Sequence, residues 1–402
     1  MIIQPKIRGF ICTTAHPVGC ANHVQEQIDY VRNGGPVSNG PKRVLIVGAS
    51  TGYGLSSRIV SAFGCCAQTF GVFFEKESSG GKTASAGWYN SVAFEQKAQA
   101  EGLYAKSFNG DAFSDDMKTK VICTIKKDWG GVDLVVYSLA SPRRQHPRTG
   151  QIARSVLKPL GKEYTNTSID MFKDKLETVT LPVATQEEVD QTVSVMGGED
   201  WEFWIDALDK EGLLSKGIMT VAYSYIGPEL TRPVYRNGTI GKAKDHLEAT
   251  ANKLNERLHK VNGRALISVN KALVTQSSSA IPFIPLYFIL LSKVMKAKGI
   301  EEGCIEQVDR LYRDFLYKGG DILVDENGFV RLDDRELRED VQQIVSRRWD
   351  MLTEDNLKEV ADLDGYHKDF LKLFGFGLDG VDYSAEVDPD QKLLSVTTQP
   401  FC

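Results

Sequence analysis

Short apolar runs alternate with amphipathic, glycine-containing stretches along the first part of the chain. The runs cover residues 43–49, 68–75, 106–112 and 132–140. Apolar runs of this length, separated by helical patterns, are typical of βαβ units, in which a helix connects two parallel strands. The pattern therefore predicts an α/β fold with a doubly wound parallel sheet.

Two further strands are predicted at 218–227 and 263–275. The stretch 241–263 lies between them, and Gly263 stands where a helix would end. Its apolar positions recur at helical spacing; they are Leu247, Ala251, Leu254, Leu258 and Val261. The sheet is therefore expected to continue after an insertion at 150–217.

We expect residues 1–402 to form a single large α/β body, with additions at both termini. The nucleotide-binding core is assigned to 43–149 and 218–300, and 301–402 to a charge-rich helical extension that ends in a loose tail at 381–396. The apolar stretch 281–299 is short and interrupted by proline. It is interpreted as a buried helix that begins near Pro285, not as a membrane span.

Three glycines, Gly48, Gly52 and Gly54, follow the first strand directly. Glycines at such a turn let the backbone approach a pyrophosphate, and the next helix offers free N–H groups. The spacing is not GxGxxG, and the Lys-Ser/Thr of an ATP-binding loop is missing. A dinucleotide is therefore the favoured ligand, with a tight turn that only packs helix on strand as the alternative.

Glu75 stands at the end of the second strand, where a dinucleotide fold meets the adenosine ribose. A carboxylate there accepts hydrogen bonds from both ribose hydroxyls and repels a 2'-phosphate, so we expect a preference for NADH over NADPH. Lys76 could weaken that preference, and a solvated carboxylate is the alternative. Other strand ends that would border the cofactor are Asp111, Ala112, Leu139 and Ala140.

A group of tyrosines and lysines follows the fifth strand. Tyr223, Tyr225 and Tyr235 precede Lys244, and eight residues separate Tyr235 from Lys244. A lysine beside a phenol lowers the pKa of the phenol and can also donate to a nicotinamide ribose. No tyrosine has a lysine four residues later, so the two cannot share one helical face unless a loop intervenes, and residues 236–241 supply one.

Charge and composition exclude several classes of function. The formal net charge of -5 argues against a nucleic-acid binder. The six histidines show no ligand spacing, so no metal is assigned. Seven scattered cysteines favour a reduced, cytoplasmic setting; they are Cys12, Cys20, Cys65, Cys66, Cys123, Cys304 and Cys402.

Five cations form a basic run in this acidic chain: Arg143, Arg144, Arg148, Arg154 and Lys158. They are candidates to meet the phosphate groups of a ligand or the acidic surface of a partner protein. A solvated basic loop is the equal alternative.

Several motifs together resemble the FabV-type enoyl-ACP reductases, which are close relatives of the trans-2-enoyl-CoA reductases. They are GASTGYG, FFEK, GWYN, YSLASPRR, AYSYIGPELTRPVYRNGTIGKAK and LVTQSSSAIPFIPLY. The resemblance covers nearly the whole chain and implies a Rossmann fold of the short-chain-dehydrogenase kind in a monomer. It also implies that NADH reduces the carbon–carbon double bond of an enoyl thioester, carried on acyl carrier protein or coenzyme A, in fatty-acid synthesis.

The resemblance also implies roles for single residues. Tyr235 would be the proton donor, Tyr225 a substrate-binding residue and Lys244 a cofactor ligand. The stretch 277–291 would wall the acyl-chain pocket, with plain core as the alternative. The remaining matched NAD positions are Gly48, Ala49, Ser50, Thr51, Gly52, Tyr53, Phe74, Glu75, Asp111, Ala112, Leu139, Ala140, Leu273, Val274 and Thr275.

Two other functions stay open at this stage. A carbonyl reductase of the short-chain dehydrogenase type would share the fold and cofactor, but its YxxxK motif is missing. An NADH-sensing protein without chemistry would bind the cofactor and turn nothing over.

Overall fold

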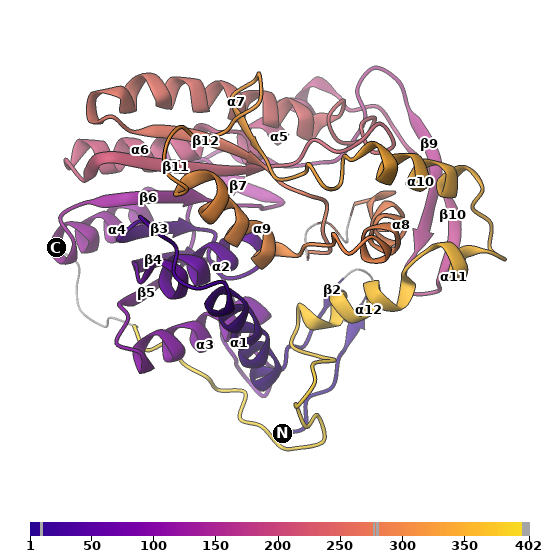
Figure 1. Cartoon of the computed structure of the whole chain (residues 1–402), viewed down its shortest axis with the longest axis horizontal. Helices are drawn as coiled ribbons and strands as arrows, with labels where there is room; N and C mark the ends of the chain where they lie inside the picture. Colours follow the sequence, from indigo (N-terminus) through magenta and orange to yellow (C-terminus); the bar gives the residue numbers. More distant parts are fainter. Residues whose placement is uncertain (9–10, 276–277, 279–280, 396–402) are drawn as a thin grey trace.

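The computed structural model describes residues 1–8, 11–275, 278 and 281–395, and its centre is a seven-stranded sheet (Figure 1). The strand order is β13-β12-β11-β6-β3-β4-β5, and all neighbouring strands are parallel. The strands are β3 (Arg43–Val47), β4 (Gln68–Phe73), β5 (Ala105–Asn109), β6 (Val132–Tyr137), β11 (Leu214–Ser224), β12 (Arg264–Val269) and β13 (Phe329–Arg331). The predicted parallel α/β sheet is confirmed.

Helices cover both faces of the sheet because the side chains of each strand point alternately to two hydrophobic cores. In β3, Val44 and Ile46 belong to one core, and Leu45 and Val47 to the other. The first core is closed by α1 (Pro17–Asn33), α2 (Gly52–Ile59), α3 (Ala86–Ala100) and α9 (Cys304–Arg310). The second core is closed by α4 (Asp115–Asp128), α6 (Glu199–Lys210) and α7 (Thr239–Leu258).

The stretch 150–217, which was predicted as an insertion, carries small elements of its own, but its helix α6 closes the second core and β11 already begins at Leu214. Its hairpin, β9 (Tyr164–Asp170) with β10 (Lys175–Leu181), stands beside α8 (Ile284–Ala297) in Figure 1. The helix α5 (Gln186–Met196) packs on α7 and on β8 (Ile152–Arg154), which pairs with β7 (Arg143–Gln145). At the N-terminus, β1 (Ile7–Arg8) pairs with β2 (Ile11–Cys12).

Residues after 300 were expected to be helical, but they also complete the sheet. β13 pairs in parallel with β12 at the sheet edge. A strand of three residues is too short to show an alternating pattern, which is why the sequence did not predict it. The helices that follow are α10 (Glu339–Asp350), α11 (Leu357–Val360) and α12 (Leu363–Lys372).

The apolar stretch near 285 is a core helix, as predicted. α8 (Ile284–Ala297) has Pro285 in its first turn, and it packs against β9, α10 and α12. Its residues 284–291 are all buried, as the core interpretation expects, and a role of this part of the stretch as a wall of the acyl-chain pocket stays a prediction. Positions 277, 279 and 280 of the expected wall lie outside the described residues. In the described part of the chain, no helix is long and apolar enough to cross a membrane.

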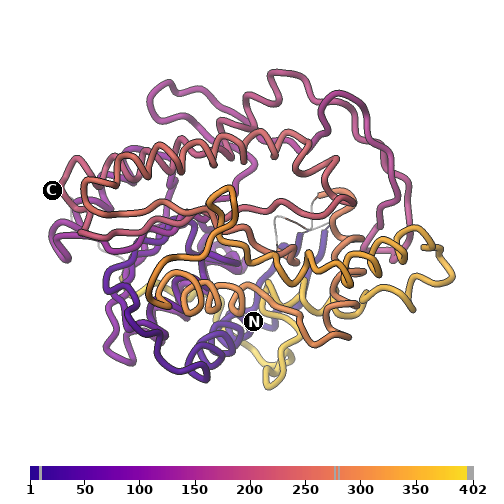
Figure 2. Tube along the Cα trace, turned by 45° about the horizontal axis from the view of Figure 1, so that its top comes forward, coloured from indigo at the N-terminus to yellow at the C-terminus, as the bar shows by residue number. Residues whose placement is uncertain are grey.

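The prediction of a loose tail is wrong for residues 381–395. The indole N–H of Trp88 donates to the Gln391 carbonyl at 2.8 Å, and the Ser395 hydroxyl donates to Glu95 Oε1 at 2.6 Å. The Val387 amide donates to the Met1 carbonyl at 3.0 Å, so the C-terminal chain returns to the N-terminus (Figure 2). The segment has no helix or strand, yet it is fastened to α3 at several points.

Candidate active site

The three glycines after β3 serve different physical purposes. A Cβ at Gly48 would overlap the Ser138 carbonyl at the end of β6, and a Cβ at Gly54 would overlap the Gly48 carbonyl. These two glycines are therefore needed for packing. Gly52 has φ +52°, and no atom lies within 4 Å of its missing Cβ. The turn is thus tightly packed at Gly48 and Gly54 and open at Gly52, where a ligand could approach the protein backbone closely.

The opening leads to the N-terminus of α2. Thr51 is the N-cap residue, but its side chain makes no capping hydrogen bond. Helix N-terminal amides without a side-chain partner, together with the helix dipole, favour an anion at this place. The glycine loop therefore fits the pyrophosphate of a dinucleotide.

Glu75 faces the same loop. The Ser50 hydroxyl donates to Glu75 Oε1 at 2.7 Å, which brings the carboxylate beside the glycine turn. The Asn109 side chain fixes the backbone of Glu75, accepting from its amide at 2.8 Å and donating to its carbonyl at 3.0 Å. Asn109, at the end of β5, has no motif that would have singled it out. Phe74, the neighbouring predicted site residue, is 79% exposed.

The other predicted cofactor positions lie at the same edge of the sheet, because the strands are parallel. Asp111 is exposed after β5, and its Oδ1 accepts from the Phe113 amide at 2.9 Å. The Ala112 carbonyl accepts from the buried Lys118 ammonium at 3.1 Å. The positions that directly follow β6 and flank the Gly48 turn are Leu139 and Ala140.

Leu273, Val274 and Thr275 were expected at the end of the sixth strand, but β12 ends earlier, at Val269. The three residues lie in the loop that follows. The Ser278 hydroxyl shapes this loop, donating to the Leu273 carbonyl at 2.7 Å and accepting from the Thr275 amide at 2.9 Å. They remain on the carboxyl side of the sheet.

Tyr53 anchors α2 through its hydroxyl. The hydroxyl oxygen lies 3.0 Å from the Lys271 carbonyl and 3.2 Å from Gln307 Oε1. Its ring packs on Tyr223 at a centroid distance of 5.3 Å, and the Tyr223 hydroxyl lies 2.6 Å from the Ser57 hydroxyl. These contacts couple the cofactor loop to β11 and α9.

Tyr225 and Tyr235 come together directly after β11. Their rings meet edge to face with centroids 4.7 Å apart and an interplanar angle of 88°. The Tyr235 carbonyl accepts from the amides of Gly238 and Gly241, both at 3.1 Å, which turns the chain into α7. The loop expected between Tyr235 and the lysine is therefore present.

Lys244 lies in the second turn of α7. Its ammonium donates to the Tyr223 carbonyl at 3.1 Å, and burial lowers the pKa of Lys244 to about 8. Burial also raises the pKa of Tyr235 to about 12. The expectation that the lysine lowers the pKa of this phenol is not met, and Tyr235 is protonated at neutral pH.

The basic run is not a patch of five available cations. Arg144 is buried; it donates to Glu199 Oε2 at 2.7 Å and to the Ser194 carbonyl at 2.6 Å. Lys158 pairs with Glu188 at 2.6 Å, while its carbonyl accepts from the Thr239 amide at 3.0 Å at the start of α7. The exposed cations of the run are Arg143, Arg148 and Arg154.

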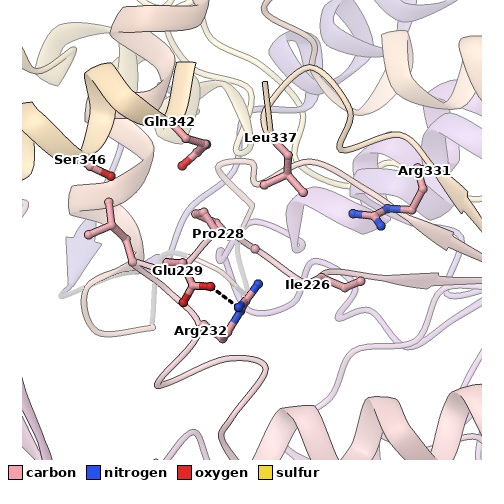
Figure 3. A pocket seen from close by; sticks show the side chains of 10 residues that line it. Ile226, Pro228, Glu229, Arg232, Arg331, Leu337, Gln342 and Ser346 are labelled. Carbon is pink, nitrogen blue, oxygen red and sulfur yellow. Dashed lines mark hydrogen bonds and ion pairs between the residues drawn. The ribbon is translucent and has the colours of Figure 1, made fainter. Parts of the chain in front are cut away.

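A cavity of about 400 Å³ lies beside the tyrosine loop (Figure 3). Arg232 and Glu229 form an ion pair in its wall. The cavity is lined by residues 226–230, Arg232, Arg331, Leu337, Gln342 and Ser346. None of the predicted cofactor positions lines it, so it is separate from the glycine loop. Over the part of the chain that is described, no group of three or more His, Cys, Asp or Glu side chains could hold a metal ion.

Models of three protein families match consecutive parts of the chain. The trans-2-enoyl-CoA reductase catalytic region matches residues 82–317, and the NAD(P)H binding domain of trans-2-enoyl-CoA reductase matches residues 2–80. The enoyl reductase FAD binding domain matches residues 324–387. The chain belongs to the trans-2-enoyl-CoA reductase family.

Relatives in this family align over almost the whole chain. An enoyl-[acyl-carrier-protein] reductase [NADH] of Coxiella burnetii is 56% identical over 402 residues, which is 100% of this chain and 99% of the relative. The crystal structure of a Treponema denticola trans-2-enoyl-CoA reductase with NAD is 50% identical, with a TM-score of 0.94 over 98% of this chain and 100% of that one. The Clostridium acetobutulicum enzyme with NADH is 45% identical, with a TM-score of 0.95 and the same coverage.

The description of the third family model mentions FAD, but the residues there do not fit a flavin dinucleotide. Where β13 ends, the chain continues as Leu332, Asp333 and Asp334, without the glycine turn that follows β3. Asp333 pairs with Arg331 at 2.7 Å and Asp334 with Arg310 at 2.9 Å, so this place offers a pyrophosphate neither a glycine turn nor the charge of these arginines. Of the helices in this stretch, α10 and α12 pack on α8. FAD therefore has no part in the reaction proposed for this chain.

Proposed function

We propose that this chain reduces the carbon–carbon double bond of a trans-2-enoyl thioester to the saturated acyl thioester, with NADH as reductant, in fatty-acid synthesis. The observation that carries the proposal is the Tyr225–Tyr235 pair, with Lys244 nearby, on the sheet edge that also holds the glycine loop. Membership in the trans-2-enoyl-CoA reductase family and the identity of 56% to an enoyl-[acyl-carrier-protein] reductase [NADH] support it.

The residues at the sheet edge fit NADH, which supplies the hydride when bound. The opening at Gly52 and the α2 N-terminus would receive the pyrophosphate. Glu75 would accept hydrogen bonds from the adenosine ribose hydroxyls, and Asp111 would lie beside the adenine. Lys244 would donate to the nicotinamide ribose. The positions that would flank the cofactor are Ala49 to Thr51, Tyr53, Phe74, Ala112, Leu139, Ala140 and Leu273 to Thr275.

Tyr235 would stabilise the charge that develops on the substrate. Hydride addition at the β-carbon moves an electron pair towards the thioester oxygen, which becomes an enolate oxygen. A protonated phenol that points there donates a hydrogen bond that strengthens as the charge grows. The raised pKa of Tyr235 supports this role, because the hydroxyl keeps its proton until the enolate forms. Tyr225 would bind the thioester beside it.

The thioester carrier is acyl carrier protein or coenzyme A, since both occur in the names of close relatives. With Arg144 and Lys158 engaged in ion pairs, Arg143, Arg148 and Arg154 are the cations of the run that could meet an acidic carrier. We infer a reducing, cytoplasmic setting, which is supported by the absence of a disulfide at Cys12, Cys20, Cys65, Cys66 and Cys304.

The proposal is tested by following NADH oxidation through its near-ultraviolet absorbance. Crotonyl-CoA is the substrate, and a 3-ketoacyl-CoA and NADPH are run in parallel. We expect turnover with NADH and crotonyl-CoA and none with the ketoacyl substrate. Turnover of the ketoacyl substrate alone would favour the carbonyl reductase. Binding of NADH without turnover of either substrate would favour an NADH-sensing protein.

A further inference from the structure

Glu336 is a fully buried carboxyl group that touches Tyr225. Its Oε1 lies 3.0 Å from the Tyr225 hydroxyl and 2.7 Å from the Tyr287 hydroxyl. Its Oε2 accepts from the Ala272 amide at 2.7 Å. Glu336 thus links three parts of the chain: Tyr225 directly after β11, Ala272 in the loop after β12, and Tyr287 in α8.

The surroundings of Glu336 do not supply a direct ion pair within the described residues. Lys271 is the nearby cation, but its ammonium donates to Glu301 Oε1 and to the Ala272 carbonyl, both at 2.9 Å. Asp333 adds a further carboxylate on the same side. Burial raises the pKa of Glu336. The hydrogen bonds from Tyr287 and Ala272 and the charge of Lys271 lower the pKa, but burial is the larger effect.

The protonation state of Glu336 decides what Tyr225 can do, because a phenol has one proton to donate. When Glu336 is ionised, it is an acceptor only, and the Tyr225 proton points to Oε1. When Glu336 is protonated, Oε2 still accepts from Ala272, so Oε1 can donate to Tyr225. The Tyr225 hydroxyl is then free to donate towards a bound thioester.

The Tyr225 hydroxyl is held in place on its other side by the chain itself. Gly227 has φ +75°, and a Cβ there would come within 2.8 Å of the Tyr225 hydroxyl oxygen and would overlap the Thr231 hydroxyl. The phenol is therefore confined between this turn and Glu336. Its oxygen has little freedom to move. The Thr231 hydroxyl, which itself lies 3.3 Å from the Pro228 carbonyl, also hydrogen-bonds the phenol, so the direction of the Tyr225 proton depends on Thr231 and on the partner at Oε1.

We propose that Glu336 is a positioning residue that must carry a proton for Tyr225 to donate to the enoyl thioester. This inference rests on the proposed function, and it makes thioester binding depend on pH. At saturating NADH, KM for crotonyl-CoA should be constant at low pH. It should rise about threefold to tenfold as Glu336 ionises, which is the size of one hydrogen bond.

The decisive variant is Glu336→Gln. The glutamine oxygen can accept from the Ala272 amide, while the two protons of the NH₂ group can be donated to Tyr225 and to Tyr287. Towards Tyr225, the variant therefore imitates the protonated carboxyl group. We expect it to keep the low KM at every pH between about 5 and 9. If KM of the Glu336→Gln variant for crotonyl-CoA rises with pH as the wild-type KM does, the inference is overturned.

Two further variants separate the proposed role of Glu336 from a general effect of changing a buried residue on folding. Tyr225→Phe removes the hydroxyl on which Glu336 acts, so KM should be high and no longer change with pH. Glu302→Gln changes another buried carboxylate, which is 4% exposed and paired with Arg310. It should keep the wild-type pH profile. A wild-type enzyme without crotonyl-CoA turnover would instead contradict the proposed function, so the two failures are distinguishable.

Discussion

Tyr225 meets Tyr235 edge to face, with ring centroids 4.7 Å apart, although β11 ends before both residues and α7 begins after them. Edge-to-face packing of this kind stabilises two aromatic rings by about 0.5–1.5 kcal/mol beyond their buried area. The contact therefore fixes an irregular loop at the sheet edge. It also brings two phenols to the place where the chain would meet its substrate.

Tyr235→Phe should leave the ring packing intact and remove the hydroxyl. Loss of a single donor to a developing oxyanion costs about 10²- to 10³-fold in kcat, so turnover of crotonyl-CoA should fall by this factor without a large change in thermal stability. Steady-state kinetics and a melting curve check this. Tyr223→Phe is the control, because its hydroxyl contacts Ser57, and it should keep kcat near the wild-type value. Wild-type kcat in Tyr235→Phe would refute the role.

NADH affinity should depend on the charge of Lys244. In the free protein its pKa is about 8, below its ordinary value, so the ammonium is present below that pH and lost above it. The proposed contact with NADH needs the charged form, so the Kd of NADH should stay constant below pH 8 and rise by at most about tenfold per pH unit above it. Fluorescence titration between about pH 6 and pH 10 measures this.

Lys244→Met should bind NADH weakly, with a Kd that does not change over the same pH range. Lys242→Met is the matched control, because Lys242 lies two positions before Lys244 on the same helix. Lys242 is exposed and pairs with Asp245. It should behave like the wild-type protein. Equal pH dependence in both variants would contradict the assignment.

Glu75→Gln should reduce the preference for NADH. The change keeps the shape of the side chain and the contact with Ser50, but it removes the charge that repels a 2'-phosphate. We expect kcat/KM with NADH to fall about tenfold or more, the size of a charge-assisted hydrogen bond, and kcat/KM with NADPH to rise. Glu77→Gln alters an exposed carboxylate two residues later and should change neither value. An unchanged NADH to NADPH ratio in Glu75→Gln would rule out the role.

Gly52→Ala and Gly212→Ala form a matched pair. Both glycines have positive φ, +52° and +66°, and no atom lies within 4 Å of either missing Cβ. Alanine in this backbone region costs about 1–2 kcal/mol, so both variants should lose similar thermal stability. NADH binding should weaken about tenfold or more in Gly52→Ala alone, because its methyl group would enter the pyrophosphate space. Equal NADH affinity in the two variants would place the pyrophosphate elsewhere.

The sheet and the cofactor loop could be predicted because their signals are local. Four apolar residues in a row, Val44 to Val47, predicted β3, and the glycines after it indicated a turn, in which Gly48 and Gly52 have positive φ. The loop between Tyr235 and Lys244 followed from Asn237, Gly238 and the eight-residue spacing. These features depend on neighbours in sequence, and the structure contains them.

Other parts of the site depend on contacts between distant residues, which no local sequence pattern indicates. Glu336 lies 111 positions from Tyr225, in a run of charged residues where a solvated carboxylate is the ordinary case. The segment after 381 looked like a tail because it has no apolar periodicity, yet Glu95 and Trp88 hold it. The effect of burial on Lys244 and Tyr235 likewise exists only in the folded chain.

The proposed reaction is conjugate hydride addition to the double bond of an enoyl thioester. NADH that carries deuterium at the transferred position should be incubated with crotonyl-CoA and the wild-type protein, and the product examined by NMR. We predict butyryl-CoA with deuterium at the β-carbon and a solvent-derived hydrogen at the α-carbon. A product in which the deuterium lies at any other carbon, or an unreacted substrate after NADH oxidation, would contradict the account.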